Sequence, residues 1–102
     1  MLAKMRRVYP NLPRKDFAMA DLKASFDKAV VDSKKLPEKP DNSTLLQLYA
    51  LFKQAGEGDA DGKRPGFTDM VGRAKWDAWN AIKGKDAATA MQEYVDLIES
   101  LK

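Results

Sequence analysis

The sequence lacks cysteine and histidine, two residue types on which much enzyme chemistry depends. Without cysteine there is no disulfide framework, no thiolate nucleophile and no cysteine-bound zinc. Without histidine, the chain lacks the usual general base near neutral pH and the commonest transition-metal ligand. We therefore predict a protein that is not an enzyme and has no catalytic residues, no metal site and no cofactor.

Long apolar runs are absent as well. The chain has 102 residues, of which 44% are apolar and spread along its length. No stretch approaches the ~20 apolar residues that span a membrane. No apolar segment follows the basic N-terminus, as it would in a secretory signal. A chain of this length favours one compact domain, and we expect it to be cytoplasmic.

Positive charge is unevenly distributed. Residues 1–20 carry five basic side chains against one acidic side chain, Asp16, which gives a net charge of +4. Residues 21–102 carry 13 basic and 14 acidic side chains, which gives a net charge of −1. We therefore divide the chain into a basic N-terminal extension, 1–20, partly ordered or flexible, and a domain, 21–102. The nearly neutral domain is not a typical nucleic-acid-binding surface.

Apolar residues recur at helical spacing in four segments, and no useful segment has the period of a strand. Leu45, Leu48, Tyr49 and Phe52, for example, fall on one helix face. Asp21 is the expected N-cap of the first helix. The first predicted helix covers residues 21–35. The second begins between residues 41 and 44 and ends at 55, and the third and fourth cover residues 72–83 and 86–102.

Proline and glycine separate these helices. Pro37 and Pro40 end the first, and Asp41 or Ser43 can cap the second. The connection over residues 56–71, GEGDADGKRPGFTDMV, is rich in turn-forming residues. A loop of this length in a small domain is usually functional or tightly packed. We predict an all-α domain of four helices with a long loop between the second and the third.

Five segments carry a resemblance to a known family. In chain order they are FDKAV (26–30) with Lys34, LLQLYALFKQA (45–55), GDADGKRPG (58–66), GRAKWDAWNAIKG (72–84) and AMQEYVDLIESL (90–101). Over residues 21–102 the chain resembles the small single-domain acyl-CoA-binding proteins. The resemblance implies an antiparallel, up-down-down-up four-helix bundle. It also implies a monomer that binds medium- to long-chain fatty acyl-CoA one-to-one, as an intracellular carrier and buffer.

The resemblance also assigns roles to residues. Tyr49, Lys53 and Lys75 match the positions that hold the 3′-phosphate of CoA. The positions around the adenine and ribose are matched by Val30, Lys34, Phe52 and Tyr94. Phe52 stands where the family usually has tyrosine, so one hydroxyl is lost. Val30 stands where alanine is usual, and the larger side chain either crowds the adenine or adds apolar contact to it.

The same residues can be interpreted without the family. Tyr49 and Lys53 are four residues apart and share a helix face, so both can donate to one phosphate. Each lysine taken alone is better explained as a solvated surface charge, and the phosphate-binding role is favoured only when the three residues are taken together within the motif. Phe52 and Tyr94 offer flat partners for a purine, although core packing is the alternative. For the acyl tail, the candidates are Leu45, Met70 and Trp76.

Two rival functions are open at this point. The basic N-terminal extension suggests a helical interaction module that binds nucleic acid or an anionic membrane. Alternatively, the chain processes acyl-CoA, although no serine has an evident base beside it. The partners we expect are fatty acyl-CoA and, transiently, acyl-CoA-using enzymes and membrane surfaces. Nucleic acid is not expected.

Overall fold

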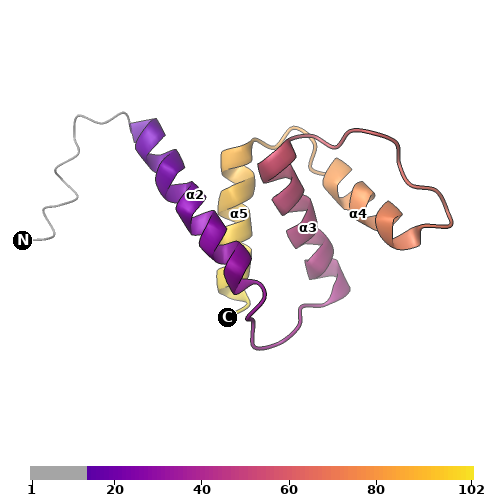
Figure 1. The fold of residues 1–102 in the computed structure, drawn as a ribbon, viewed down its shortest axis with the longest axis horizontal. Coiled ribbons are helices and arrows are strands. Elements are labelled where there is room, and N and C mark those ends of the chain that lie inside the picture. Colours follow the sequence, from indigo (N-terminus) through magenta and orange to yellow (C-terminus); the bar gives the residue numbers. More distant parts are fainter. Residues whose placement is uncertain (1–13) are drawn as a thin grey trace, which may run out of the picture.

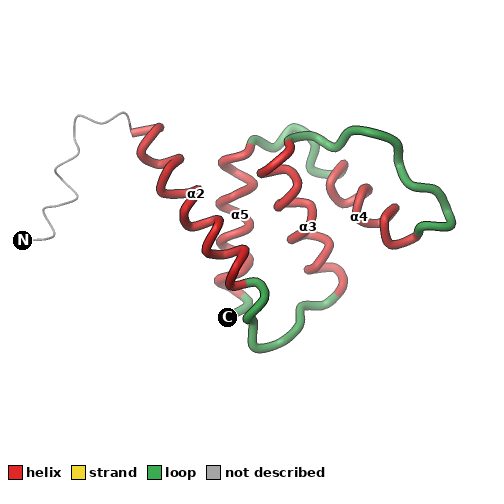
Figure 2. Tube along the Cα trace, in the orientation of Figure 1, coloured by secondary structure: helices red, strands yellow, loops and turns green. Residues whose placement is uncertain are grey.

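The computed structural model describes residues 14–102, with side chains from residue 20 onward, and this part of the chain is all-helical. The helices are α2 (Arg14–Asp32), α3 (Asn42–Glu57), α4 (Met70–Asn80) and α5 (Ala87–Ser100). Figure 2 shows that turns and loops make up the rest of the described chain. The predicted all-α class is confirmed. None of the described helices is both long and apolar enough to cross a bilayer.

The helices form the predicted up-down-down-up arrangement. In Figure 1, α3 and α4 run in one direction, and α2 and α5 run in the other. The backbone of α5 packs between α2 and α3, and α4 packs against α3. Because α3 and α4 run in the same direction, residues 58–69 must lead the chain from the end of α3 back past α4 to the point where α4 begins. This explains why the loop is long.

The core lies where α2, α3 and α5 meet. Its members recur every three or four residues, the spacing that places side chains on one helix face. They are Phe26, Ala29, Leu48, Leu51, Ala55, Ala90, Met91, Tyr94 and Ile98. Burying one leucine, phenylalanine or isoleucine side chain stabilises a fold by about 1.5–3 kcal/mol, so these contacts hold three helices in register.

An aspartate begins each of the last three helices. The carboxylates of Asp41, Asp69 and Asp86 accept hydrogen bonds from backbone N–H groups three residues further on, at 2.8, 3.0 and 3.2 Å. These bonds satisfy N–H groups that have no partner inside the helix. The expected cap at Asp41 and the expected helix start near Asp86 are confirmed.

The predicted start of the first helix is wrong. Asp21 does not cap it, because α2 begins at Arg14 and ends at Asp32 rather than at residue 35. The segment RKDFAMA at 14–20 consists mostly of good helix formers, so the helix continues through Asp21, which is exposed. The suggested boundary after residue 20 therefore falls inside a helix. Residues 1–13 of the predicted extension lie outside the described part of the chain.

The third predicted helix is displaced by a few residues. It was expected over residues 72–83, but α4 spans Met70–Asn80. Asp69 caps it earlier than the sequence suggested, and residues 81–84 form turns that end at Gly84, which has a φ of 94°. Helix α3 runs to Glu57, two residues beyond its expected end, and Gly58 follows with a φ of 85°.

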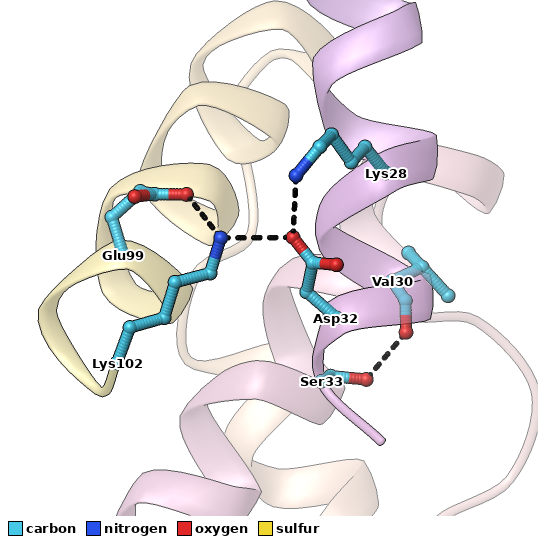
Figure 3. A network of polar contacts seen from close by, with 6 residues as sticks. All are labelled: Lys28, Val30, Asp32, Ser33, Glu99 and Lys102. Carbon is cyan, nitrogen blue, oxygen red and sulfur yellow. Dashed lines mark hydrogen bonds and ion pairs between the residues drawn. The ribbon is translucent and has the colours of Figure 1, made fainter. Parts of the chain in front are cut away.

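Ion pairs fasten the end of α2 to the end of α5 (Figure 3). The carboxylate of Asp32 accepts from the ammonium groups of Lys28 at 3.0 Å and Lys102 at 2.9 Å, and Lys102 also contacts Glu99 at 2.8 Å. Hydrogen bonds from Lys102 and Lys28 lower the pKa of Asp32. This network fixes the point where the chain leaves α2 toward the candidate site.

Candidate functional site

A buried glutamine joins the end of α3 to two loops. Gln54 is 1% exposed, and its Nε2 donates to the Asp59 carboxylate and to the Lys85 carbonyl, both at 2.8 Å. The same Asp59 oxygen accepts from the Gly84 N–H at 2.7 Å. Hydrogen bonds from Gly84 and Gln54 lower the pKa of Asp59. Together these bonds connect the beginning of the long loop to the turn between α4 and α5.

Two tryptophans of α4 donate hydrogen bonds to the backbone of the long loop. Trp79 is 5% exposed, and its indole N–H donates to the Gly58 carbonyl at 2.7 Å. The indole N–H of Trp76 donates to the Asp61 carbonyl at 3.1 Å. One tryptophan thus belongs to the interior, and the other fastens the loop.

A bidentate ion pair adds a third attachment. Arg64 of the loop donates through Nε and Nη2 to the two carboxylate oxygens of Asp77 in α4, each at 2.7 Å. This hydrogen bonding lowers the pKa of Asp77 and raises the pKa of Arg64. The three attachments set the position of α4, and therefore of Lys75 on it, relative to α3.

The helices and the turn after α2 enclose a pocket of about 400 Å³ on one face of the molecule. It brings together five of the residues predicted for the ligand site. Its lining consists of Ser33, Pro40, Leu45, Leu48, Tyr49, Phe52, Lys75 and Tyr94. We call it the head pocket. Sequence reasoning missed Ser33, Pro40 and Leu48 as lining residues. The only signal for Ser33 and Pro40 was their position beside Lys34 and before α3, and Leu48 was interpreted only as part of the apolar face of its helix.

Two polar groups in the head pocket are available to a ligand. The Lys75 ammonium lies 5.4 Å from the centre of the Tyr49 ring. Within the described residues, neither this ammonium nor the Tyr49 hydroxyl has a hydrogen-bond partner. Both groups can donate, and one carries a full charge, so the pair can bind an anion.

Lys53 lies one turn along α3 from Tyr49 but does not line the head pocket. Its ammonium is 2.5 Å from the Glu57 carboxylate and 5.0 Å from the centre of the Trp79 ring. The hydrogen bond to Glu57 raises the pKa of Lys53. The lysine is therefore charged at neutral pH and already engaged by an anionic partner.

Aromatic rings form one side of the head pocket. Tyr94 packs edge-on against Phe26 with ring centres 5.1 Å apart, and Phe52 lies 6.5 Å from Tyr94. Tyr94 is 5% exposed, whereas Phe52 is 45% exposed. Phe26 thus supports two rings that reach the pocket, and Phe52 keeps a large free surface.

The two remaining residues predicted for the nucleotide lie beside the head pocket rather than in its lining. Val30 is partly buried against the core, and its carbonyl accepts from the Ser33 hydroxyl at 2.6 Å (Figure 3). Lys34 is exposed in the turn after α2. Ser33, directly before Lys34, is the residue of this turn that lines the pocket.

An apolar pocket of about 370 Å³ adjoins the head pocket. Leu45 and Lys75 line both, so the two pockets lie side by side. The other lining residues are Asn42, Leu46, Met70, Val71 and Ala74. We call it the tail pocket. Leu45 and Met70, two of the three candidates for the acyl tail, line this pocket, whereas Trp76 does not.

The fold and the two pockets define a small helical module for an amphiphilic ligand with an anionic head. In the part of the chain that the structure describes, no acidic side chains gather as potential metal ligands. A family model described as acyl-CoA-binding protein matches residues 23–98, and the chain belongs to this family.

Individual relatives agree with the family model. An acyl-CoA-binding protein homolog of Drosophila melanogaster is 49% identical over 74% of this chain and 88% of its own length. The crystal structure of Oryza sativa acyl-CoA-binding protein 2 superposes with a TM-score of 0.80 at 35% identity, covering 83% of this chain and 92% of the other. For the Moniliophthora perniciosa protein the TM-score is 0.73 at 42% identity, with 78% of each chain covered.

The chain also resembles a segment of much longer proteins. Enoyl-CoA delta isomerase 2 of Rattus norvegicus is 46% identical over 82% of this chain, and its human counterpart is 43% identical over the same share. The chain spans 22% and 21% of these two relatives. The similarity therefore concerns about a fifth of each isomerase.

Proposed function

We propose that this chain binds medium- to long-chain fatty acyl-CoA esters and acts as an intracellular carrier and buffer of them. One observation carries the proposal: the head pocket, with its two available donors, lies beside the apolar tail pocket and shares Leu45 and Lys75 with it. A single ligand with an anionic nucleotide head and an alkyl tail would occupy both. Family membership supports the same ligand class.

Three side chains are assigned to bind the 3′-phosphate of the nucleotide head. The Tyr49 hydroxyl and the Lys75 ammonium would both donate to the 3′-phosphate, the second in a charge-assisted hydrogen bond. Lys53 lies on the same face of α3 as Tyr49, and it would join them by exchanging its Glu57 partner for the phosphate.

The adenine is assigned to the aromatic side of the head pocket. Phe52 has an exposed ring face on which a base can stack, and Tyr94 borders it. A flat ring loses few degrees of freedom on binding, which favours stacking. Val30 and Lys34 would border the nucleotide from the end of α2.

The tail is assigned to Leu45 and Met70 in the tail pocket, and Trp76 is a weaker candidate. Each methylene removed from water contributes about 0.8 kcal/mol. Four additional methylenes would therefore strengthen binding by about 3 kcal/mol, on the order of a hundredfold. The tail thus accounts for much of the discrimination against free CoA.

Calorimetric titration with palmitoyl-CoA, CoA and palmitate tests the proposal. We expect tight one-to-one binding of palmitoyl-CoA only, because CoA lacks the tail and palmitate lacks the nucleotide. Similar affinities for all three ligands would contradict a site that recognises head and tail together.

Substitution of both predicted phosphate-binding lysines tests the residue assignment. The double variant Lys53→Ala, Lys75→Ala should bind palmitoyl-CoA at least about a hundredfold more weakly, because two hydrogen bonds to a charged group are lost. The matched control is Lys23→Ala, Lys83→Ala, which removes the same charge from exposed positions. Equal affinity of the two double variants would refute the assignment.

The carrier acts on its ligand only by binding it. We infer a cytoplasmic monomer that passes acyl-CoA to acyl-CoA-using enzymes and does not bind nucleic acid. Palmitoyl-CoA incubated with the pure protein should be recovered unchanged, and release of free CoA would reveal a hydrolase instead.

A further inference from the structure

An apolar cluster is exposed where the long loop enters α4. Phe67, Met70 and Val71 are 81%, 75% and 68% exposed, more than any other large apolar side chain with described burial. We call these three residues the corner patch. In Figure 1 this corner lies at the outer edge of the molecule, on the side away from α2. Clustered apolar exposure of this kind marks a contact surface.

A cation lies against the corner patch. The Arg73 guanidinium lies 4.3 Å from the centre of the Phe67 ring. Two of the four basic side chains over residues 63–75 are engaged elsewhere, since Arg64 pairs with Asp77 and Lys75 lines the head pocket. The Asp69 carboxylate caps α4, and the neighbouring Asp77 is paired with Arg64. The Arg73 guanidinium beside Phe67 is therefore the group that can pair with an anionic partner.

The corner patch is continuous with the tail pocket. Met70 and Val71 line that pocket together with Leu45, and Met70 also lines a shallow depression with Phe67 and Arg73. A partner that covers the patch would thus lie at the mouth of the cavity assigned to the alkyl tail.

We propose that the corner patch docks on the surface of an anionic lipid bilayer, with Phe67 inserted among the acyl chains and Arg73 at the headgroups. A stable protein interface buries about 800 Å² on each partner, far more than three side chains supply. A bilayer requires only apolar groups that can be inserted and cations that face anionic lipids. The purpose of docking rests on the proposed carrier function: an acyl tail would move between bilayer and pocket without crossing water.

Vesicle flotation of the full chain tests docking. We expect the protein to bind vesicles of phosphatidylcholine with phosphatidylserine, and to bind pure phosphatidylcholine less well. Phe67→Ser should weaken the binding about tenfold, and Arg73→Gln should weaken it severalfold. The matched control is Val31→Ser, which removes a 51% exposed apolar side chain from α2 and should change nothing. No vesicle binding, or equal binding by Phe67→Ser, would overturn the proposal.

The absence of cysteine permits a site-specific measurement. Phe67→Cys and Val31→Cys, each labelled with an environment-sensitive fluorophore, report whether that position enters the apolar layer. Addition of anionic vesicles should shift the emission to the blue at position 67 and leave it unchanged at position 31. Equal shifts would mean that the protein docks without this orientation and would contradict the proposal.

Calorimetry without vesicles separates docking from the carrier function. Phe67 lines neither the head pocket nor the tail pocket, so Phe67→Ser should bind palmitoyl-CoA like the unmodified chain. If the unmodified chain floats with vesicles but does not bind palmitoyl-CoA, the carrier function fails and docking stands. If both proteins bind palmitoyl-CoA and float equally, docking fails and the carrier function stands.

Discussion

At the scale of single residues, Lys53 illustrates how a neighbour can set ligand affinity. Its ammonium contacts Glu57, whereas the other two groups assigned to the phosphate, on Tyr49 and Lys75, have no hydrogen-bond partner in the described chain. A phosphate that recruits Lys53 must therefore displace a carboxylate. Glu57 is 56% exposed, so solvent screens the contact and the cost of displacement is modest.

We expect Glu57→Gln to raise the affinity for palmitoyl-CoA by up to about fivefold, since an exposed ion pair contributes at most about 1 kcal/mol. Calorimetric titration measures the change. Glu99→Gln is the control, because it makes the same change in net charge at a position paired with Lys102. If the two variants behave alike, the effect comes from overall charge and the competition described for Lys53 is excluded.

Much of the candidate site could be predicted residue by residue. Tyr49, Phe52 and Lys53 follow one another on α3 at helical spacing, and that spacing alone indicates their shared face. The meeting of Lys75 with Tyr49 could not be derived from spacing, since it depends on how the long loop returns the chain to α4. Ser33 was missed because a serine in a turn has an ordinary local role.

At the scale of elements, Gln54 connects three segments that are separate in the sequence. Its amide nitrogen bonds Asp59 and Lys85, while its buried Oε1 has no partner in the described chain. Both partners are acceptors, and this fixes the orientation of the amide. Loss of this one side chain therefore removes a hydrogen bond from each of two loops.

Gln54→Ala should lower the free energy of unfolding by about 2–4 kcal/mol, because it combines a cavity with lost buried hydrogen bonds. Urea denaturation measures this quantity. Gln47→Ala provides the comparison on the same helix, where the side chain is exposed and the loss should be close to zero. A loss below about 1 kcal/mol for Gln54→Ala would show that the network contributes little.

The helices were predictable because their local signals agree with their packing. The Asp41 and Asp86 caps, and Gly58 after α3, all act where local chemistry indicates. The error at α2 has the opposite origin. Asp21 has the chemistry of a cap, but the residues before it favour helix more strongly than a cap favours a boundary. Such competition between neighbouring segments is difficult to resolve from one sequence.

At the scale of the whole molecule, carboxylates dominate the response to pH. Hydrogen bonds and ion pairs lower the pKa values of Asp32, Asp41, Asp59, Asp77 and Asp86. A carboxyl group whose pKa is lower in the folded chain than in the unfolded chain stabilises the fold above its unfolded pKa. This stabilisation is lost as the pH falls through the folded pKa.

The free energy of unfolding should therefore fall as the pH drops below about 4, close to the ordinary pKa of aspartate. Histidine is absent, so we expect no corresponding step near pH 6.5. Chemical denaturation at a series of pH values measures the profile. In Asp86→Asn the cap is retained without a titrating group, and the acid dependence should become shallower. An unchanged slope would contradict the contribution of Asp86.

The order of packing across the molecule is α2, α5, α3, α4 (Figure 1), so each outer helix lies alongside a single neighbour. The head pocket nevertheless takes residues from α3, α4, α5 and the turn after α2. A ligand bound in that pocket would contact both the outer helix α4 and the inner helices α3 and α5, and would therefore hold α4 in place. Backbone amides of α4 should accordingly exchange with deuterium more slowly when palmitoyl-CoA is added, by a larger factor than those in the middle of α5.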